Sequence, residues 1–149
     1  GPTILVLTRQ NLPMLQKDNR KENLVNKGAY KIRDFKEYDA TILSSGSEVE
    51  IACSASNKLF ENNNLKIRVV SMSSFELFEK NDDSYKNEIL GNKTIFAIEA
   101  GVINGWEKYI KNENFVGMST FGESGPYKDL YKHFKITDDH LIEKIIKNL

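Results

Sequence analysis

The chain has little of what marks a disulfide-stapled, metal-binding or membrane protein. It contains one cysteine, Cys53, among 149 residues, which excludes an internal disulfide, and it has only two histidines. Its 21 basic and 21 acidic side chains cancel, so no excess of charge attracts nucleic acid or an acidic membrane. No apolar run approaches the roughly 20 residues that span a bilayer, and no signal-peptide pattern is visible. We therefore expect a cytoplasmic protein with no nucleic-acid or membrane partner.

The clearest structural pattern lies in residues 40–60. Residues 40–44 (ATILS) are a short apolar run bounded by turn residues, which predicts a buried strand. Residues 48–60 follow with apolar side chains at helical spacing, and Ser47 and Glu50 have the spacing of a capping box. A strand, a tight turn and a helix form the unit of parallel sheets, in which loops at the carboxyl ends of strands usually carry function.

The rest of the chain repeats strand-like and helical patterns. We expect a three-layer α/β/α domain around a sheet of about five mostly parallel strands. Residues 127, 130, 131 and 134, and residues 141, 142, 145, 146 and 149, lie at helical spacing and are expected in the core. Further strands are expected at residues 28–33, 66–71, 94–98 and 115–118, and helices at 75–78, 85–90, 105–110, 127–134 and 138–149.

Two hydroxyl-rich turns and one acidic residue are the polar candidates at strand ends. Residues 44–47 and 71–74 could cap helices or bind a small anion, and capping is the commoner use of such hydroxyls. Glu99 ends the strand at residues 94–98 and could act as an acid–base group or as a structural hydrogen-bond acceptor. Cys53, His133 and His140 lack partners at metal or nucleophile spacing, and we assign them no catalytic role.

The first 27 residues differ from the remainder. Residues 4–7 are apolar on both faces, as in a buried parallel strand, and the sequence RQNLP follows at residues 9–13. Residues 17–27 are polar with little periodicity, which indicates a linker at a domain boundary. A chain that opens inside a buried strand is expected to be a piece of a larger protein.

Several motifs together resemble the transketolase family. Residues 1–13 resemble the end of its middle, pyrimidine-binding domain, and the remainder resembles its C-terminal domain. The resemblance implies residues 1–16 as the terminal strand and substrate-phosphate loop of the middle domain, 17–27 as the linker and 28–149 as the C-terminal domain. It also implies that the strand at residues 28–33 is an antiparallel edge strand. The motifs are KGAY (27–30), SGSEVE (45–50), IRVVSMSS (67–74), IEAG (98–101), GMSTFG (117–122) and SG (124–125).

The resemblance implies a homodimeric enzyme that uses thiamine diphosphate and Mg²⁺ or Ca²⁺ to move a two-carbon ketol unit between sugar phosphates. The Arg of the RQNLP run binds the substrate phosphate in the family, and this role transfers to Arg9, whose guanidinium matches phosphate with paired donors. The family's cofactor and metal residues belong to domains absent here, so we expect this chain alone to bind no cofactor and to be inactive. The family gives Glu99 no chemical role, which favours its structural interpretation.

Two kinds of alternative remain. The first is a relative in the same cofactor class, either dihydroxyacetone synthase or a 2-oxoacid dehydrogenase β-chain. Residues 9–13 and 121–124 favour transketolase over the dehydrogenase and separate it poorly from dihydroxyacetone synthase. The second is a free-standing regulatory or interaction module that binds a small anion at the serine-rich turns.

Overall fold

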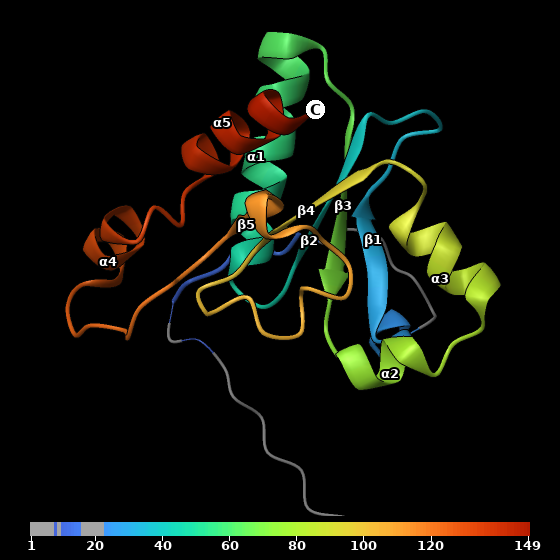
Figure 1. Cartoon of the computed structure of the whole chain (residues 1–149), viewed down its shortest axis with the longest axis horizontal. Helices are drawn as coiled ribbons and strands as arrows, with labels where there is room; N and C mark the ends of the chain where they lie inside the picture. The colour runs from blue at the N-terminus through green and yellow to red at the C-terminus, as the bar shows by residue number, and fades with distance from the viewer. Residues whose placement is uncertain (1–7, 9, 16–22) are drawn as a thin grey trace, which may run out of the picture.

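A five-stranded sheet forms the centre of the molecule (Figure 1). The computed structural model describes residues 8, 10–15 and 23–149. The strand order is β1-β3-β2-β4-β5; β1 runs antiparallel to β3 at one edge, and the other pairs are parallel. This confirms the predicted mostly parallel sheet with one antiparallel edge strand. The strands are β1 (Ala29–Arg33), β2 (Ala40–Ser44), β3 (Ile67–Met72), β4 (Thr94–Ile98) and β5 (Phe115–Val116).

Helices cover both faces of this sheet (Figure 1). They begin and end close to the predicted residues, except that residues 105–110 form hydrogen-bonded turns instead of a helix. The described part of the chain also has two short 3₁₀ turns. The helices are α1 (Glu48–Asn63), α2 (Phe75–Glu79), α3 (Asp83–Leu90), α4 (Tyr127–His133) and α5 (Asp138–Asn148), and the 3₁₀ turns are η1 (Leu24–Lys27) and η2 (Asn112–Asn114).

Alternate residues of each central strand feed two separate cores. Ile42 of β2 points to the face covered by α1 and α5, where it joins Leu59 and Leu141 in one fully buried cluster. Leu43, the next residue, points to the opposite face and packs with Phe78 of α2 and Ile89 of α3. This two-residue period is the pleat of a strand, and it confirms the three-layer α/β/α arrangement.

The chain order places a topological switch point between β2 and β4. After β2 the chain passes through α1 to β3 on one side, and after β3 it returns through α2 and α3 to β4 on the other side of β2. The carboxyl ends of β2 and β4 lie next to each other, because Ser44 pairs with Ile98 in parallel register. In open α/β sheets the crevice at such a point is the usual place for a functional site.

Several local predictions are wrong for identifiable reasons. The capping box does not form, because the Ser47 hydroxyl donates to the neighbouring Glu48 carboxylate and makes no cap bond to the α1 backbone. The strand at residues 115–118 ends after Val116, since the Met118 amide donates instead to the carbonyl of Gly101.

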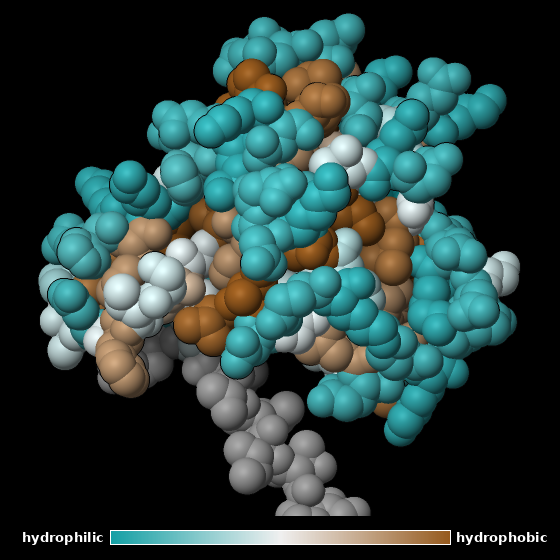
Figure 2. Space-filling view, viewed as in Figure 1, coloured by the Kyte–Doolittle hydropathy of each residue, from teal (hydrophilic) through white to brown (hydrophobic). Residues whose placement is uncertain are grey.

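The apolar stripes near the end of the chain are buried only in part. Leu141 and Ile145 of α5 lie in the core, but Ile146 is 52% exposed and Leu149 is 53% exposed. No residue of α4 is fully buried, so the stripe predicted as core there is a half-buried margin of the domain. Figure 2 shows this face of the molecule, where hydrophilic residues cover most of the surface and apolar ones show mainly in the middle.

Part of the N-terminal prediction lies outside the described residues. This applies to the strand expected at residues 4–7, to Arg9 and to most of the linker, whose last residues form η1. Within the described residues, no helix is both long enough and apolar enough to cross a membrane.

Candidate functional site

Two acidic side chains meet at the switch point between β2 and β4. Glu48 is the first residue of α1, directly after the turn at residues 45–47 that follows β2, and it is only 3% exposed. Glu99 follows the last residue of β4, and its backbone amide extends the pairing with β5 by donating to the carbonyl of Val116. Burying an ionised carboxylate is costly unless partners compensate it, so the partners of this pair decide what it can do.

Hydroxyl groups supply most of those partners. The Ser45 hydroxyl donates to Glu99 Oε2 at 2.6 Å, and the Ser47 hydroxyl donates to Glu48 Oε1 at 2.7 Å. The hydroxyl of Ser44, which is fully buried, donates to the carbonyl of Ile98 at 3.0 Å and ties the two strand ends together. No ion pair joins either carboxylate to a cation among the residues that the structure describes.

Protonation of Glu99 reduces the negative charge of this cluster. The pKa of Glu99 is raised to about 7: burial is the largest cause, and the charge of the adjacent Glu48 and a hydrogen bond with it add to the rise, whereas the Ser45 hydroxyl works in the opposite direction. Two neighbouring carboxylates in a low-dielectric site cannot both ionise cheaply, so Glu99 retains its proton close to neutral pH. Glu99 therefore carries less than a full negative charge near neutral pH.

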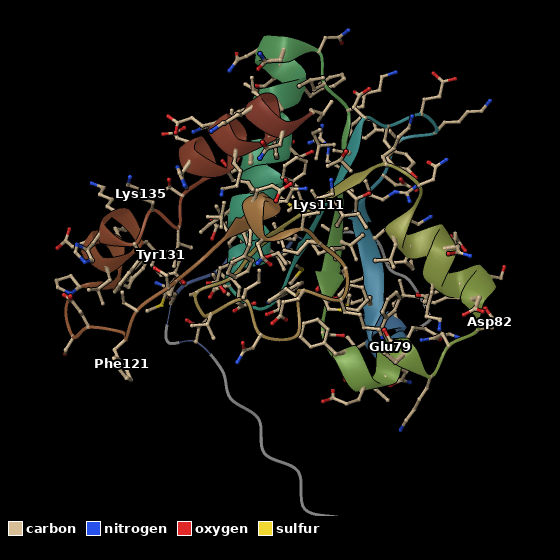
Figure 3. The ribbon with its side chains drawn as sticks, in the orientation of Figure 1. Glu79, Asp82, Lys111, Phe121, Tyr131 and Lys135 are labelled. Atoms are coloured by element: carbon tan, nitrogen blue, oxygen red, sulfur yellow. The ribbon has the colours of Figure 1, made fainter. Side chains whose placement is uncertain are left out.

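Tyr131 closes the cluster from α4. Its hydroxyl donates to Glu48 Oε1 and lies 3.5 Å from the hydroxyl of Ser47. Burial and the bond to Glu48 both raise the pKa of this phenol, which keeps it a donor. The side-chain amide of Gln10 donates to the same hydroxyl at 3.4 Å. In Figure 3, Tyr131 lies between α4 and the body of the domain.

The segment at residues 10–15 lies over the carboxyl end of the sheet. One hollow of about 410 Å³ separates it from α1 and α4, with Gln10, Ser47 and Tyr131 in its walls. A second, of about 290 Å³, is lined by residues 12–15 together with Gly46 and Ser71. The segment therefore lies beside the first turns of α1, with one hollow between it and α4.

The structure brings together some predicted site residues and leaves others apart. Glu99 accepts hydrogen bonds, as its structural interpretation predicts, but it also pairs with a second carboxylate. Ser74 caps α2 as predicted, since its hydroxyl accepts from the amide of Leu77 at 3.2 Å, whereas the hydroxyls at residues 44, 45 and 47 are donors to other groups. Arg9 lies outside the described residues.

The two histidines and the cysteine are remote from this cluster. His133 lies 3.7 Å from Glu123 and His140 lies 3.4 Å from Glu143, both on the surface. Burial raises the pKa of the Cys53 thiol, which makes it a poor nucleophile. Among the described residues, no group of three or more acidic, histidine or cysteine side chains is placed to hold a metal ion.

Sequence reasoning missed Glu48, Tyr131 and Gln10. The sequence pattern places Glu48 at a helix start and Tyr131 on an apolar stripe, because periodicity alone does not show which hydroxyl meets which acid. One signal was available: the two predicted strands ending at residues 44 and 98 are each followed closely by a glutamate. Pairing those strands in parallel would have brought the acids together.

Comparison with known proteins identifies the family. The family model of the transketolase-like C-terminal domain matches residues 28–137. A transketolase of Sinorhizobium medicae is 42% identical over 150 residues, which cover 99% of this chain and 22% of that protein. Transketolase 1 of Escherichia coli is 39% identical and is covered to the same 22%. The chain thus spans about a fifth of the length of these relatives.

Solved structures agree with this result. A transketolase of Leishmania mexicana matches 80% of the chain with a TM-score of 0.75 and 40% identity, over 18% of its own length. A transketolase of Pichia stipitis, in complex with sedoheptulose-7-phosphate, matches 93% of the chain with a TM-score of 0.83 and 31% identity, over 20% of its own length. With the family model covering most of the chain and relatives this similar along nearly all of it, the chain belongs to the transketolase family.

Proposed function

We propose that this chain works within a transketolase, which transfers a two-carbon ketol unit from a ketose phosphate to an aldose phosphate. The observation that carries the proposal is the 42% identity to a transketolase along 99% of the chain. The related Pichia stipitis enzyme holds sedoheptulose-7-phosphate, a ketose phosphate of the expected kind. On the same ground, we propose that the substrates are sugar phosphates of the pentose phosphate pathway. We also propose that the enzyme acts in the cytoplasm.

Within such an enzyme, we divide the chain into three parts. Residues 1–16 would complete the middle domain and carry the substrate-phosphate loop, residues 17–27 would form the linker, and residues 28–149 would form the C-terminal domain. The match of the family model to residues 28–137 supports the last part. Arg9 is the residue we assign to the substrate phosphate, because a guanidinium is permanently charged and pairs with phosphate oxygens through two donors.

Thiamine diphosphate and Mg²⁺ or Ca²⁺ would bind outside the described part of this chain. When bound, the cofactor supplies the electron sink for breaking and forming the carbon–carbon bond. The contribution of the chain's own residues is then to bind and orient the phosphate end of the substrate through Arg9. We assign no residue of this chain a proton transfer at the reacting carbon.

We further propose that the domain takes part in a homodimer. Phe121 supports this, because its side chain is 97% exposed at the tip of a loop in Figure 3. An aromatic side chain so exposed is typical of a surface that packs against another polypeptide. The loop from residue 117 to residue 126 would provide part of that contact and of the wall of the substrate channel.

The alternative of an anion-binding module is less well supported. Such a site needs free donors, but the hydroxyls of Ser44, Ser45 and Ser47 are all donated to protein acceptors. The two acidic residues beside them would also repel an anion. At the other turn, the hydroxyls of Ser73 and Ser74 donate to Gly28 and Glu76.

Substitution of Arg9 tests the proposal in the full-length enzyme. A charge-assisted hydrogen bond contributes about 1.5–3 kcal/mol, so Arg9→Ala should weaken phosphorylated substrates by about 10- to 150-fold. Because the phosphate is remote from the reacting carbon, the loss should appear mainly in KM, with kcat much less affected. Steady-state kinetics with xylulose-5-phosphate and with hydroxypyruvate, which lacks a phosphate, would measure the effect.

Lys147→Ala is the matched control, since it removes an exposed cation near the end of α5 that lines neither hollow beside residues 10–15, and it should leave both donors unchanged. Hydroxypyruvate should react almost normally with Arg9→Ala. Equal slowing of hydroxypyruvate and sugar phosphates would show that Arg9 supports the structure of the site, and the assignment would then be wrong.

A further inference from the structure

Helix α4 belongs to a stretch of chain that buries none of its residues. The stretch runs from residue 119 to residue 135, and every residue in it is exposed or half-buried. Firmly held residues lie on both sides of it: the Met118 amide donates to the carbonyl of Gly101 at 2.8 Å, and Ile136 is only 2% exposed. A region with so few buried contacts is expected to open before the rest of a domain unfolds.

The two ends of this stretch are places where the backbone can change direction. Residues 119–126 form no helix or strand and include two glycines. At the other end, the Lys135 amide donates to the carbonyl of Lys132, and the Ile136 amide donates to the carbonyl of Tyr131. Lys135 itself has a φ of 56°, in the left-handed region where glycine is usual at a helix end. A few loop or helix-end residues of this kind are what a hinge requires.

The polar ties of the stretch to the rest of the domain converge on one group. Among the described residues, each side-chain hydrogen bond that leaves residues 119–135 involves the Tyr131 hydroxyl. This hydroxyl donates to Glu48, which is 3% exposed, and accepts from Gln10 at 3.4 Å. A hydrogen bond to a carboxylate is about twice as strong as a neutral one, so the bond to Glu48 dominates.

The position of α4 gives its movement a consequence. In Figure 1 the helix lies at one side of the molecule, apart from the sheet. It contributes Tyr127, Lys128 and Tyr131 to the wall of the hollow of about 410 Å³ that it shares with α1 and residues 10–11. Displacement of α4 would remove that wall and expose Ser47 and Glu48 at the start of α1.

We propose that residues 119–135 are a hinged flap over this hollow, which the hydrogen bond from Tyr131 to Glu48 holds closed. The flap opens as a unit while the sheet and its other helices stay folded. Access to the hollow and to the buried carboxylate of Glu48 is therefore controlled by one phenol. The inference does not depend on the proposed transketolase activity.

Native-state hydrogen exchange of the 149-residue chain tests this proposal. The Leu130 and Phe134 amides donate to the carbonyls of Pro126 and Leu130, so they report opening of the flap. Their exchange should depend only weakly on low concentrations of urea, because the opening exposes little surface. The amide of Leu43, a fully buried residue of the central strand β2, should show the full urea dependence of global unfolding.

Tyr131→Phe keeps the ring and removes the closing hydrogen bond. The Leu130 and Phe134 amides should then exchange at least about ten-fold faster, the value of one hydrogen bond to a charged group. Tyr127→Phe is the matched control: its ring packs edge-to-face on Tyr131, its hydroxyl has no partner among the described residues, and exchange should stay as in the wild type. Unchanged exchange in Tyr131→Phe would overturn the proposal.

Ile89→Val distinguishes flap opening from global unfolding. Ile89 is 2% exposed in the core on the opposite face of the sheet, and loss of one buried methyl group should speed exchange of the Leu43 amide by about two- to ten-fold. The Leu130 and Phe134 amides should keep their wild-type rates, because the flap opens while that core stays intact. An equal acceleration of all three amides would show that the flap opens only when the whole domain unfolds, and the proposal would be wrong.

Glu48→Gln identifies the acceptor. In this background the hydrogen bond from Tyr131 is neutral, so Tyr131→Phe should speed exchange of the flap amides by only about three-fold. The same factor in both backgrounds would mean that Glu48 does not hold the flap closed.

Discussion

Two clusters in the described part of the molecule bury charged side chains, and each compensates the charge in a different way. On β3, the guanidinium of Arg68 is 7% exposed; its Nε donates to Asp34 Oδ1 at 2.7 Å, and one Nη donates to the carbonyl of Glu88 at 2.9 Å. The ring of Tyr38 lies against it, 3.9 Å from the guanidinium carbon. At the switch point no cation among the described residues plays this part, and partial protonation of Glu99 near neutral pH lowers the charge instead.

The difference determines how each cluster responds to pH. Partial burial works to raise the pKa of Asp34, but hydrogen bonds from Arg68 and Lys31 outweigh it, so this pKa is lowered. The ion pair therefore stays fully charged at every pH above the ordinary carboxyl range. The pKa of Glu99 is raised to about 7, so the second cluster changes its charge near neutrality. The charge of the first cluster is therefore constant near neutral pH, whereas the charge of the second cluster depends on pH there.

Removing the fixed cation should have the largest effect on stability. Arg68→Met keeps the apolar stem but removes the donor of the Glu88 carbonyl and one of the donors of Asp34, which keeps its contacts with Lys31 and the Phe35 amide. Breaking a buried ion pair from one side costs about 3 kcal/mol or more, and urea unfolding of the chain at neutral pH would measure it.

Asp34→Asn is the control from the other side of the same pair. Its amide oxygen can still accept from Arg68, and its side chain is 35% exposed, so the loss should be smaller, about 1 kcal/mol. If Arg68→Met lowered the free energy of unfolding no more than Asp34→Asn does, the buried guanidinium would not be the main stabilising group of this pair.

The pH dependence of stability should come from the other cluster. Because the pKa of Glu99 is raised from 4.5 to about 7 in the folded state, the folded chain holds a proton that the unfolded chain releases. This stabilisation is complete below about pH 4.5 and is lost as the pH rises through about 7. After allowance for solvent screening of a partly exposed carboxyl, the loss between the two ends should be about 1–2 kcal/mol.

Thermal unfolding between about pH 5 and pH 8 would measure this slope. Glu99→Gln keeps a neutral donor toward Glu48 and removes the titration, so its unfolding temperature should vary much less with pH. Glu61→Gln removes an exposed carboxyl of α1 and should retain the wild-type slope. If Glu99→Gln kept that slope as well, a group other than Glu99 would cause the pH dependence.

The sequence allowed most of the fold to be predicted, because strands and helices depend on local periodicity. Residues 40–44 were predicted as a buried strand and form β2 with those same bounds. Residues 105–110 were predicted as a helix and form turns, since Trp106 is held by tertiary packing against Phe75 instead of by helical periodicity. Ile146 and Leu149 lie on the predicted buried stripe but are 52% and 53% exposed, whereas Lys144 and Asn148 of α5 donate to the Glu113 carbonyl of η2.

The site was less accessible to sequence reasoning, because it depends on contacts between distant residues. Glu48, Glu99 and Tyr131 belong to three elements that only the strand order brings together. The raised pKa of Glu99 follows from its burial, and a glutamate in a sequence does not show whether it is buried. Ser47 shows the limit clearly: its position before an acidic first turn matches a helix cap, yet its hydroxyl serves the buried acid.

The smallest predicted effect separates these two uses of a hydroxyl. Ser47 and Thr137 both precede helices with two acidic residues in the first turn, but only the Thr137 hydroxyl caps, by accepting from the amide of His140 at 3.3 Å. Aspartate is as good a cap as serine or threonine, so Thr137→Asp should be nearly neutral. Ser47→Asp places a third carboxylate beside Glu48 and should cost about 1 kcal/mol, the repulsion of two charges about 4 Å apart near a surface after screening. Urea unfolding of both variants above neutral pH would measure the contrast. Equal stability of the two variants would mean that Ser47 acts as an ordinary cap and that its bond to Glu48 adds nothing to the cluster.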